Sequence, residues 1–378
     1  MGVMRVLVLV QAYPSQEKPY NQAYVHARVL HYLKQGWQVE VLSFACQKPY
    51  LFEGVQILPE TALSKQANRY DVWVSHAPNL RNHLRLILKW HKYWQRLVWV
   101  IHGHEVLIKA HYYPPPYPWM PQTTAIKQVI DRVYDTLKVQ ILAKFLDHYL
   151  PRQKIQLIFV SQWMKEAFDT CVKLSSPLAQ NRFSIIANPV HPLFLQTEWV
   201  PPSQPAADFI TLRPLDEPKY AVDLVYQLAQ NNPNLQFHLY GQGRFFQYHP
   251  PLPNLTWFNR FCTQAELPAL LANYRAALMP TRLDAQGVMA CEMATLGIPV
   301  LTSDLPVCRE MLKGFPRTGF FSLSGQTDLQ AFLKQSLPER GDFRRFSPEQ
   351  TVAKEILVIA SGKACDSDGL ENCSVETL

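Results

Sequence analysis

The sequence lacks any run of about 18 uncharged apolar residues, the length that a helix needs to cross a bilayer. Its first ten residues hold one arginine and a short apolar run without an Ala-x-Ala cleavage site, so we expect a buried strand there rather than a signal peptide. The seven cysteines form no Cys-x-x-Cys pair and no cluster with histidine, which argues against a disulfide framework and a zinc site. Scattered thiols suit a reducing compartment, and we expect a cytoplasmic protein.

Glycine is also scarce. The 378 residues include 14 glycines against 30 prolines, which favours stiff connections. Charged residues make up 18% of the chain and hydrophobic residues 48%, a composition too apolar for a disordered protein. Because one hydrophobic core rarely supports a chain of this length, we expect two domains.

Acidic residues are few in the first 200 positions, where 22 lysines and arginines stand against 12 aspartates and glutamates. The rest of the chain holds 15 basic and 18 acidic residues, so the formal net charge of +7 comes from the first half. A basic half indicates an anionic partner, and anionic lipid and phosphorylated substrates both fit. Because no basic-aromatic module of the known nucleic-acid-binding folds accompanies the charge, we expect no nucleic-acid partner.

Short apolar runs alternate with helical segments along the chain. Val3–Val10 is continuously apolar, as in a parallel strand buried on both faces, and a helix over 22–34, ended by Gly36, leads to a second strand at 39–44. The same alternation predicts strands at 72–75, 98–101, 155–160, 209–212, 236–240, 255–258, 276–280 and 299–302, and helices at 221–230, 264–273 and 287–296. This order predicts an α/β fold with parallel sheets.

The domain boundaries follow from two further signals. Residues 199–205 are rich in proline without periodicity, which marks an interdomain linker, and Ser347 followed by Pro348 is a start signal for a last helix. The predicted organisation is a first domain over 1–192, a linker over 193–208, a second domain over 209–345, a helix over 346–361 and a disordered tail over 362–378. Asp366-Ser-Asp368 in the tail matches the Asp-x-Asp pattern of some metal sites. We attribute this match to chance and expect no metal site.

The most informative stretch is 280–304, which reads Pro-Thr-Arg-Leu-Asp-Ala-Gln-Gly-Val-Met-Ala-Cys-Glu-Met-Ala-Thr-Leu-Gly-Ile-Pro-Val-Leu-Thr-Ser-Asp. It combines a strand end, a loop with Asp284, and a helix that opens at Gly287 and carries Glu292. The free N–H groups of a helix start suit a diphosphate. Glu292 can accept hydrogen bonds from a ribose diol, and Asp284 lies at the edge where open α/β sheets bind ligands. Alone, a glutamate in the first turns of a helix is an ordinary charge–dipole pairing.

This stretch resembles the donor site of glycosyltransferase family 4, which carries two glutamates separated by seven residues, then an Ala/Gly-rich turn, Pro-Val and Ser-Asp. The resemblance implies that Glu292 contacts the ribose and that Asp284, in place of the usual glutamate, contacts the transferred sugar. It also implies donor contacts from Gln286, Gly287 and Val288.

Residues 210–224 are similar to the Gly-Arg-Leu…Glu-Lys-Gly…Asp segment of the same family. Arg213 and Lys219 match the two cations that hold the donor diphosphate, while Leu212 and Tyr220 replace the usual glycines. Two fixed cations neutralise the charge of a leaving diphosphate, as a metal does elsewhere. The alternative is an ordinary solvated pair in a surface loop.

Two other elements are similar to family landmarks. Gly241 and Gly243 follow a strand where the family lines its nucleotide pocket, although a tight turn explains them equally well. His102, in Val-Trp-Val-Ile-His-Gly-His-Glu, matches a histidine beside the transferred sugar, and a buried polar residue at a strand end is the alternative. The first loop, 11–23, has Tyr-Pro-Ser instead of the family's glycines.

The stretch 81–119 leaves two interpretations open. Residues 81–97 are basic, aromatic and roughly helical in period, and residues 112–119 add an aromatic loop. Such a stretch can lie in an anionic membrane interface, and it can equally pack on the sheet with a solvated basic face.

The resemblance implies a GT-B fold, with two Rossmann-like domains facing each other across a cleft and the last helix returning to the first. The first domain would bind a glycan or polyprenyl-linked acceptor, and the second the nucleotide-sugar donor. The implied activity is that of a metal-independent, retaining hexosyltransferase of polysaccharide or lipopolysaccharide biosynthesis at the inner face of the cytoplasmic membrane. Two alternatives stay open, a nucleotide-sugar epimerase and a non-catalytic partner that binds nucleotide or glycan.

Overall fold

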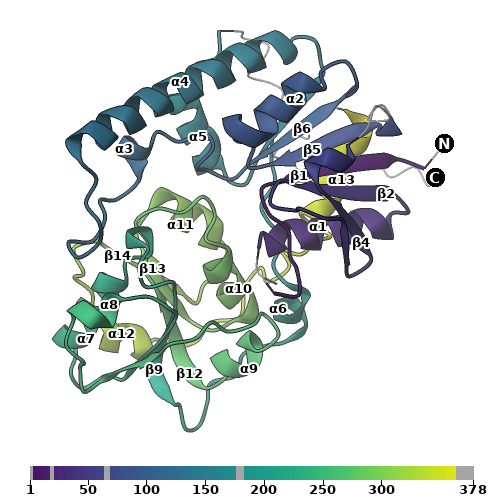
Figure 1. Cartoon of the computed structure of the whole chain (residues 1–378). Coiled ribbons are helices and arrows are strands. Elements are labelled where there is room, and N and C mark those ends of the chain that lie inside the picture. Colours follow the sequence, from purple (N-terminus) through teal and green to yellow (C-terminus); the bar gives the residue numbers. More distant parts are fainter. Residues whose placement is uncertain (1–2, 18–20, 64–68, 176–182, 363–378) are drawn as a thin grey trace. The chain divides into compact units, whose positions relative to one another are not determined.

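The computed structural model describes residues 3–17, 21–63, 69–175 and 183–362 (Figure 1). The chain divides into two compact units. The first unit contains residues 1–109, 131–189 and 348–378, and the second contains residues 110–130 and 190–347. The predicted tail beyond Gly362, with Asp366 and Asp368, lies outside the described residues.

The first unit is built on an eight-stranded sheet with the order β3-β4-β2-β1-β5-β6-β7-β8. All neighbouring strands pair in parallel except β3 and β4, which form an antiparallel pair at one edge. The strands are β1 (Arg5–Val10), β2 (Gln38–Ser43), β3 (Tyr50–Phe52), β4 (Val55–Leu58), β5 (Val72–His76), β6 (Leu97–Ile101), β7 (Ile155–Phe159) and β8 (Phe183–Ile185). The apolar run of β1 lies in the middle of the sheet and is buried from Val6 to Val10, as expected for a strand covered on both faces.

Helices flank this sheet. They are α1 (Ala23–Lys34), α2 (Arg85–Lys89), α4 (Ala125–Tyr149), α5 (Gln162–Cys171) and α13 (Val352–Ser361), with short turns at η1 (Glu60–Ala62) and η3 (Leu80–Leu84). The short helix α3 (Lys109–Tyr112) begins at the last residue of the 1–109 segment and continues into the second unit. The helix α4 is continuous from the second unit into the first. The last described helix, α13, packs against α1, so this late segment of the chain belongs to the first unit.

The second unit holds a six-stranded sheet with the order β11-β10-β9-β12-β13-β14, parallel throughout. Its strands are β9 (Ala207–Leu212), β10 (Phe237–Tyr240), β11 (Leu255–Phe258), β12 (Tyr274–Met279), β13 (Val300–Ser303) and β14 (Thr318–Phe321). Its helices are α6 (Pro192–Gln196), α7 (Val222–Asn231), α8 (Phe245–Tyr248), α9 (Leu267–Leu271), α10 (Val288–Leu296), α11 (Pro306–Leu312) and α12 (Leu329–Lys334), with a 3₁₀ turn, η5 (Pro218–Tyr220). The predicted α/β class with parallel sheets is confirmed.

Two segments differ from the sequence expectation. The last helix begins at Val352 instead of Phe346, because residues 343–350 form successive turns and Ala353 donates its N–H to the carbonyl of Pro348. The segment predicted as a linker contains α6 and belongs to the second unit. Its Trp199 is buried and donates from Nε1 to the carbonyl of Tyr274 at 3.1 Å, so this tryptophan is a packing residue.

Candidate functional site

The residues predicted to bind a donor gather at one edge of the second sheet. Arg213 directly follows β9, Gly241 follows β10, and the loop with Asp284 follows β12. The strands β10, β9 and β12 are parallel neighbours in this order, so their carboxyl ends lie side by side. Open α/β sheets bind ligands at this edge.

The helix α10 opens at this edge with a loop that its own sequence fixes. Gly287 is the N-cap and has a φ of 72°, a left-handed conformation that favours glycine. Asp284 accepts hydrogen bonds at Oδ1 from the N–H of Gly287 at 2.7 Å and of Gln286 at 3.2 Å. Its second oxygen, Oδ2, accepts no hydrogen bond from the described residues. Asp284 therefore shapes the start of α10 through one of its two oxygens.

Glu292 is a buried carboxyl on α10, with 2% of its surface exposed. Its Oε1 accepts hydrogen bonds from Gln264 Nε2 at 3.1 Å and from the backbone N–H of His191 at 3.3 Å. Burial raises the pKa of Glu292 to about 7, although the hydrogen bond from His191 acts in the opposite direction. Within the described residues, no cation forms a salt bridge with this carboxyl. An acidic group in such surroundings is a candidate for contact with a polar ligand.

The two predicted cations share one aromatic ring. The guanidinium carbon of Arg213 and the Nζ of Lys219 each lie 4.8 Å from the ring centroid of Tyr220. Tyr220, which stands where the family has glycine, thus holds both cations by cation–π contacts. The carbonyl of Lys219 accepts from the N–H of Arg282 and, at 3.0 Å, from Thr281 Oγ1, which ties the Lys219 turn to the Asp284 loop.

Arg213 is buried, and no carboxylate of the described residues forms an ion pair with it. It is 6% exposed, and its Nε lacks a hydrogen-bond partner among the residues that the structure describes. A buried guanidinium N–H without a hydrogen-bond acceptor is costly, and a bound anion that accepts from it would remove that cost. Burial raises the pKa of Cys308 to about 11, and the charges of Asp284 and Arg213 act on this pKa in opposite directions.

Sequence reasoning missed a group of side chains that supports these cations. Arg282 makes a bidentate ion pair with Asp223, with N–O distances of 2.8 and 2.6 Å, and Asp223 also accepts from the hydroxyl of Tyr117 at 2.9 Å. Although burial opposes it, the pairing with Arg282 holds the pKa of Asp223 below its usual value. The available signal was the position of Arg282 inside the donor motif. Gln264 and His191 were also missed as partners of Glu292.

The two predicted glycines are required by packing. A Cβ on Gly241 would lie 1.8 Å from the carbonyl oxygen of Arg213, and a Cβ on Gly243 would lie 2.7 Å from the Cβ of Leu215. The loops after β9 and β10 can therefore approach each other only with glycine at these positions. Gly241 acts on the candidate site by allowing the backbone position of Arg213.

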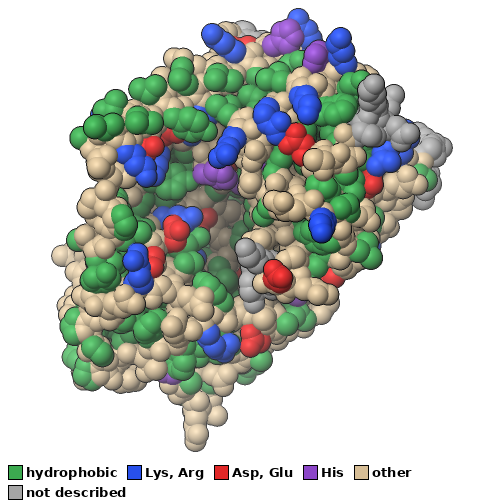
Figure 2. All heavy atoms as spheres, in the orientation of Figure 1, with side chains coloured by type: hydrophobic (Ala, Val, Ile, Leu, Met, Phe, Trp, Pro, Cys, Tyr) green, Lys and Arg blue, Asp and Glu red, His purple; other side chains and the backbone are tan. Residues whose placement is uncertain are grey.

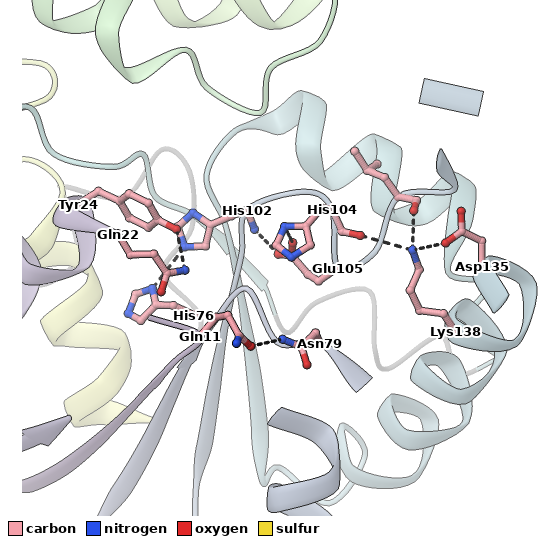
Figure 3. Close-up of polar contacts among 11 residues, drawn as sticks. Gln11, Gln22, Tyr24, His76, Asn79, His102, His104, Glu105, Asp135 and Lys138 are labelled. Atoms are coloured by element: carbon pink, nitrogen blue, oxygen red, sulfur yellow. Dashed lines mark hydrogen bonds and ion pairs between the residues drawn. The ribbon is translucent and has the colours of Figure 1, made fainter. Parts of the chain in front are cut away.

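His102 lies in the first unit, directly after β6, at the centre of a polar cluster (Figure 3). Its Nε2 is 3.3 Å from Nδ1 of His76, its ring centroid is 4.7 Å from that of Tyr24, and its backbone N–H donates to Glu105. Desolvation, aided by the charge of the buried Arg28, lowers the pKa of His102 well below its usual value. The imidazole is therefore neutral at pH 7 and can donate one hydrogen bond or accept one.

The stretch 81–119 is divided between the two units. In the first, Leu84, Leu86, Ile87 and Trp94 are buried, and the basic side chains around them are exposed. In the second, Tyr117 stacks on Trp119 with centroids 4.5 Å apart, and Trp119 contacts the rings of Phe245, Tyr248 and His249. Most apolar side chains of the stretch are therefore packed inside the units.

The described ranges contain neither a cluster suited to a metal ion nor a membrane-spanning helix. In residues 3–17, 21–63, 69–175 and 183–362, no group of three or more His, Cys, Asp or Glu side chains is arranged to hold a metal ion. No helix in the same ranges combines the length and the apolar character needed to span a bilayer.

The likeness of the chain to known proteins lies in the fold. No protein-family model and no curated protein sequence matches it. Among solved structures, sucrose-phosphate synthase from Thermosynechococcus elongatus matches with a TM-score of 0.63 at 10% identity, over 95% of this chain and 98% of that chain. The lipopolysaccharide outer core galactosyltransferase WaaB matches with a TM-score of 0.59 at 15% identity, over 95% of this chain and 99% of that one. HepE from Anabaena, solved with UDP and glucose, matches with a TM-score of 0.60 at 12% identity, over 95% of each chain. The chain therefore has the α/β fold of the GT-B proteins, as its sequence predicted.

Proposed function

We propose that this chain is a glycosyltransferase that moves a sugar from a nucleoside diphosphate sugar to a glycan or lipid-linked acceptor, with retention of anomeric configuration. The observation that carries the proposal is Arg213, a buried arginine whose Nε has no partner among the described residues, beside Lys219 at the edge where α10 opens. This arrangement suits a diphosphate, because fixed cations and helix N–H groups both favour negative charge.

Each residue of the site has a proposed part in holding the donor. Arg213 and Lys219 neutralise the diphosphate as the bond to the sugar breaks, which is electrostatic stabilisation of a leaving group. Glu292 accepts hydrogen bonds from the ribose hydroxyls, and Asp284 accepts one from the sugar through Oδ2. The backbone N–H of Val288 faces the phosphates, whereas Gln286 and Gly287, whose N–H groups donate to Asp284, shape the loop around them. Because two cations already balance the charge, we expect turnover without a divalent metal.

His102 is the proposed contribution of the first unit. Its neutral imidazole can hydrogen-bond a hydroxyl of the transferred sugar without adding a positive charge near an oxocarbenium-like centre. Its low pKa, caused by burial and by Arg28, supports this part. A role in cell-surface polysaccharide or lipopolysaccharide synthesis is supported by the similarity to WaaB, a lipopolysaccharide outer core galactosyltransferase.

The test is a nucleotide-release assay over UDP-, GDP- and ADP-sugars, with membrane lipid extract as the acceptor source. We expect acceptor-dependent release that persists in EDTA and falls at least about 100-fold in Glu292→Ala, the size of other electrostatic losses at enzyme sites. Glu339→Ala, which removes an exposed glutamate of the same unit, serves as the matched control and should keep full turnover. Equal turnover in the two variants would refute the site.

The bonded state of Asp284 favours one other candidate, a nucleotide-binding protein without transferase activity. Asp284 is shorter than the glutamate of the family, and its Oδ1 is already used by the start of α10. Tight nucleotide binding with no release over the whole donor and acceptor screen would support this candidate. Conversion of the sugar without acceptor would instead indicate an epimerase.

A further inference from the structure

An apolar stripe lies exposed along α4. Seven large apolar side chains of this helix are between 44% and 75% exposed: Ile126, Val129, Ile130, Val133, Tyr134, Leu137 and Ile141. They recur three or four residues apart, which places them on one face of the helix. Figure 2 shows hydrophobic side chains along the edge of the molecule where α4 lies in Figure 1. We call these seven residues the α4 stripe.

The opposite face of α4 is the one that packs on the protein. Its buried residues include Val139, Leu142, Phe145 and Leu146, and Lys138 reaches inward to Asp135 at 2.8 Å. The helix is thus apolar on two sides, and its own fold needs only one of them. Exposed apolar surface of this extent marks an interaction site. Spanning 16 residues, the α4 stripe is about 24 Å long.

The charged residues around the α4 stripe indicate which kind of partner it binds. Lys127 and Arg132 are exposed on its two flanks, and Lys144 extends its line about two turns beyond Leu137. The acidic residues of the helix are less exposed than these cations. Asp135 is buried in its pair with Lys138, and Asp131 and Asp147 are half-buried. An apolar face bordered by exposed cations matches an anionic lipid surface, where the apolar side chains enter the headgroup region and the cations meet phosphate.

A second copy of the chain fits this face less well. Pairing through the α4 stripe would cover Lys144, and α4 offers no fully exposed carboxylate to pair with it. Removing an unpaired cation from water opposes such a contact. The basic residues of 81–92 supply further positive charge for an anionic lipid surface. They lie near the end of α4, because Trp94, which follows them, contacts Tyr149, the last residue of α4, with ring centroids 5.1 Å apart.

We propose that the α4 stripe is a membrane-docking surface that places this protein on anionic lipid with α4 lying in the interface. The proposal goes beyond the transferase function and does not depend on it, since docking needs no turnover. It assigns the apolar part of a membrane contact to α4, whereas residues 81–97 supply mainly charge.

The experiment is flotation of the full chain with vesicles of phosphatidylcholine alone or with 30% phosphatidylglycerol, about a third of the lipid. We expect recovery with the anionic vesicles and at least about 10-fold weaker binding for the triple variant Val133→Ser/Leu137→Ser/Ile141→Ser, because three apolar side chains no longer leave water. Lys144→Glu should reduce the preference for anionic lipid.

The matched control is Leu51→Ser/Val200→Ser/Leu357→Ser, which removes three similarly exposed apolar side chains elsewhere, 68%, 69% and 42% exposed. It should float like the wild type, and circular dichroism should show that both triple variants are folded. Equal recovery of the stripe variant and the wild type would overturn the proposal, as would equal recovery from neutral and anionic vesicles. A wild-type dimer that the stripe variant converts to a monomer, without vesicle binding, would assign the face to a second copy and also overturn it.

Discussion

Glu292 is an acidic side chain in a buried position, where its ionised form is unfavourable. It is buried on α10, its Oε1 alone accepts hydrogen bonds from the described residues, and burial raises its pKa to about 7. An ionised carboxylate at this position costs stability, while the same ionised form is the better acceptor for ribose hydroxyls. Such a cost is expected where function rather than folding determines the side chain, which agrees with the ribose contact proposed for Glu292.

The stability of the protein should therefore depend on pH through Glu292. Its pKa is raised from 4.5 to about 7, so its contribution to stability is fully present below pH 4.5 and is lost as the pH rises through 7. The shift corresponds to roughly 3 kcal/mol. We expect Glu292→Gln, which stays neutral, to unfold at higher denaturant than the wild type at pH 8 and at nearly the same denaturant at pH 4.5. Urea titrations at both pH values measure this, with Glu339→Gln as the exposed control. A gap between Glu292→Gln and the wild type that does not change with pH would contradict the expectation.

Asp284 has a structural role through Oδ1 and a proposed sugar contact through Oδ2, and substitutions can separate the two. Asparagine keeps the oxygen that accepts from Gly287 and Gln286, so we expect Asp284→Asn to retain wild-type stability while turnover falls at least about 10-fold. Asp284→Ala should lose turnover and also about 1 kcal/mol of stability, because the N–H groups at the start of α10 lose their acceptor. Thermal unfolding together with nucleotide release distinguishes the roles. Unchanged turnover in the asparagine variant would leave Asp284 a purely structural residue.

The pairing of α1 with α13 depends on a buried ion pair. Arg28 on α1 donates from Nε to Glu355 on α13 at 2.7 Å, and both side chains are fully buried. Arg28 also donates to Asn188 Oδ1 at 2.6 Å, and Tyr32 donates to Glu355. The network joins three parts of the first unit that are far apart in the sequence.

Removing one partner of this pair should be severe. Glu355→Ala leaves the Arg28 charge buried and uncompensated, and we expect a loss of about 3–5 kcal/mol in the free energy of unfolding. Leu357→Ala, on the same helix and 42% exposed, should cost no more than about 0.5 kcal/mol. Chemical denaturation of the two variants tests the difference. A similar small loss in both would show that α13 does not hold the first unit together.

The sequence predicted elements well where one physical signal dominated. Continuous apolar runs located β1, β5, β6, β7 and β11 to within about a residue or two, a scale typical of disagreement at element ends. The Ser347–Pro348 start signal failed, because turns occupy these residues and the helix begins at Val352. The predicted linker carried prolines as expected, yet Trp199 anchors it to β12. The proline content of the segment could not predict the contact of Trp199 with Tyr274, because packing depends on residues that are distant in sequence.

At the scale of the whole molecule, the sequence predicted the candidate site only as far as strand order allowed. Arg213, Gly241 and Asp284 follow parallel strands, so an α/β reading places them at one sheet edge, as the second unit has them. The contacts of Glu292 with His191 and Gln264 were not foreseeable, because these residues lie 101 and 28 positions away. The cation–π contacts of Arg213 and Lys219 with Tyr220 could not be predicted either, because the family has a glycine at this position.

Hydrogen exchange can test where the whole chain binds its nucleotide. If the diphosphate lies between the cations and the opening of α10, UDP or another active nucleotide should slow exchange most at 211–220 and 281–293, because ligand binding suppresses local opening of the segments that it contacts. The sheet core of the first unit at 5–10 serves as the internal reference, since its strand is already buried and hydrogen-bonded. Protection should vanish in Arg213→Ala, which removes the buried cation without touching the backbone amides that are measured. Protection that is confined to the first unit, or that persists unchanged in Arg213→Ala, would place the nucleotide elsewhere, because Arg213 is the described cation of the site with a buried N–H that lacks an acceptor.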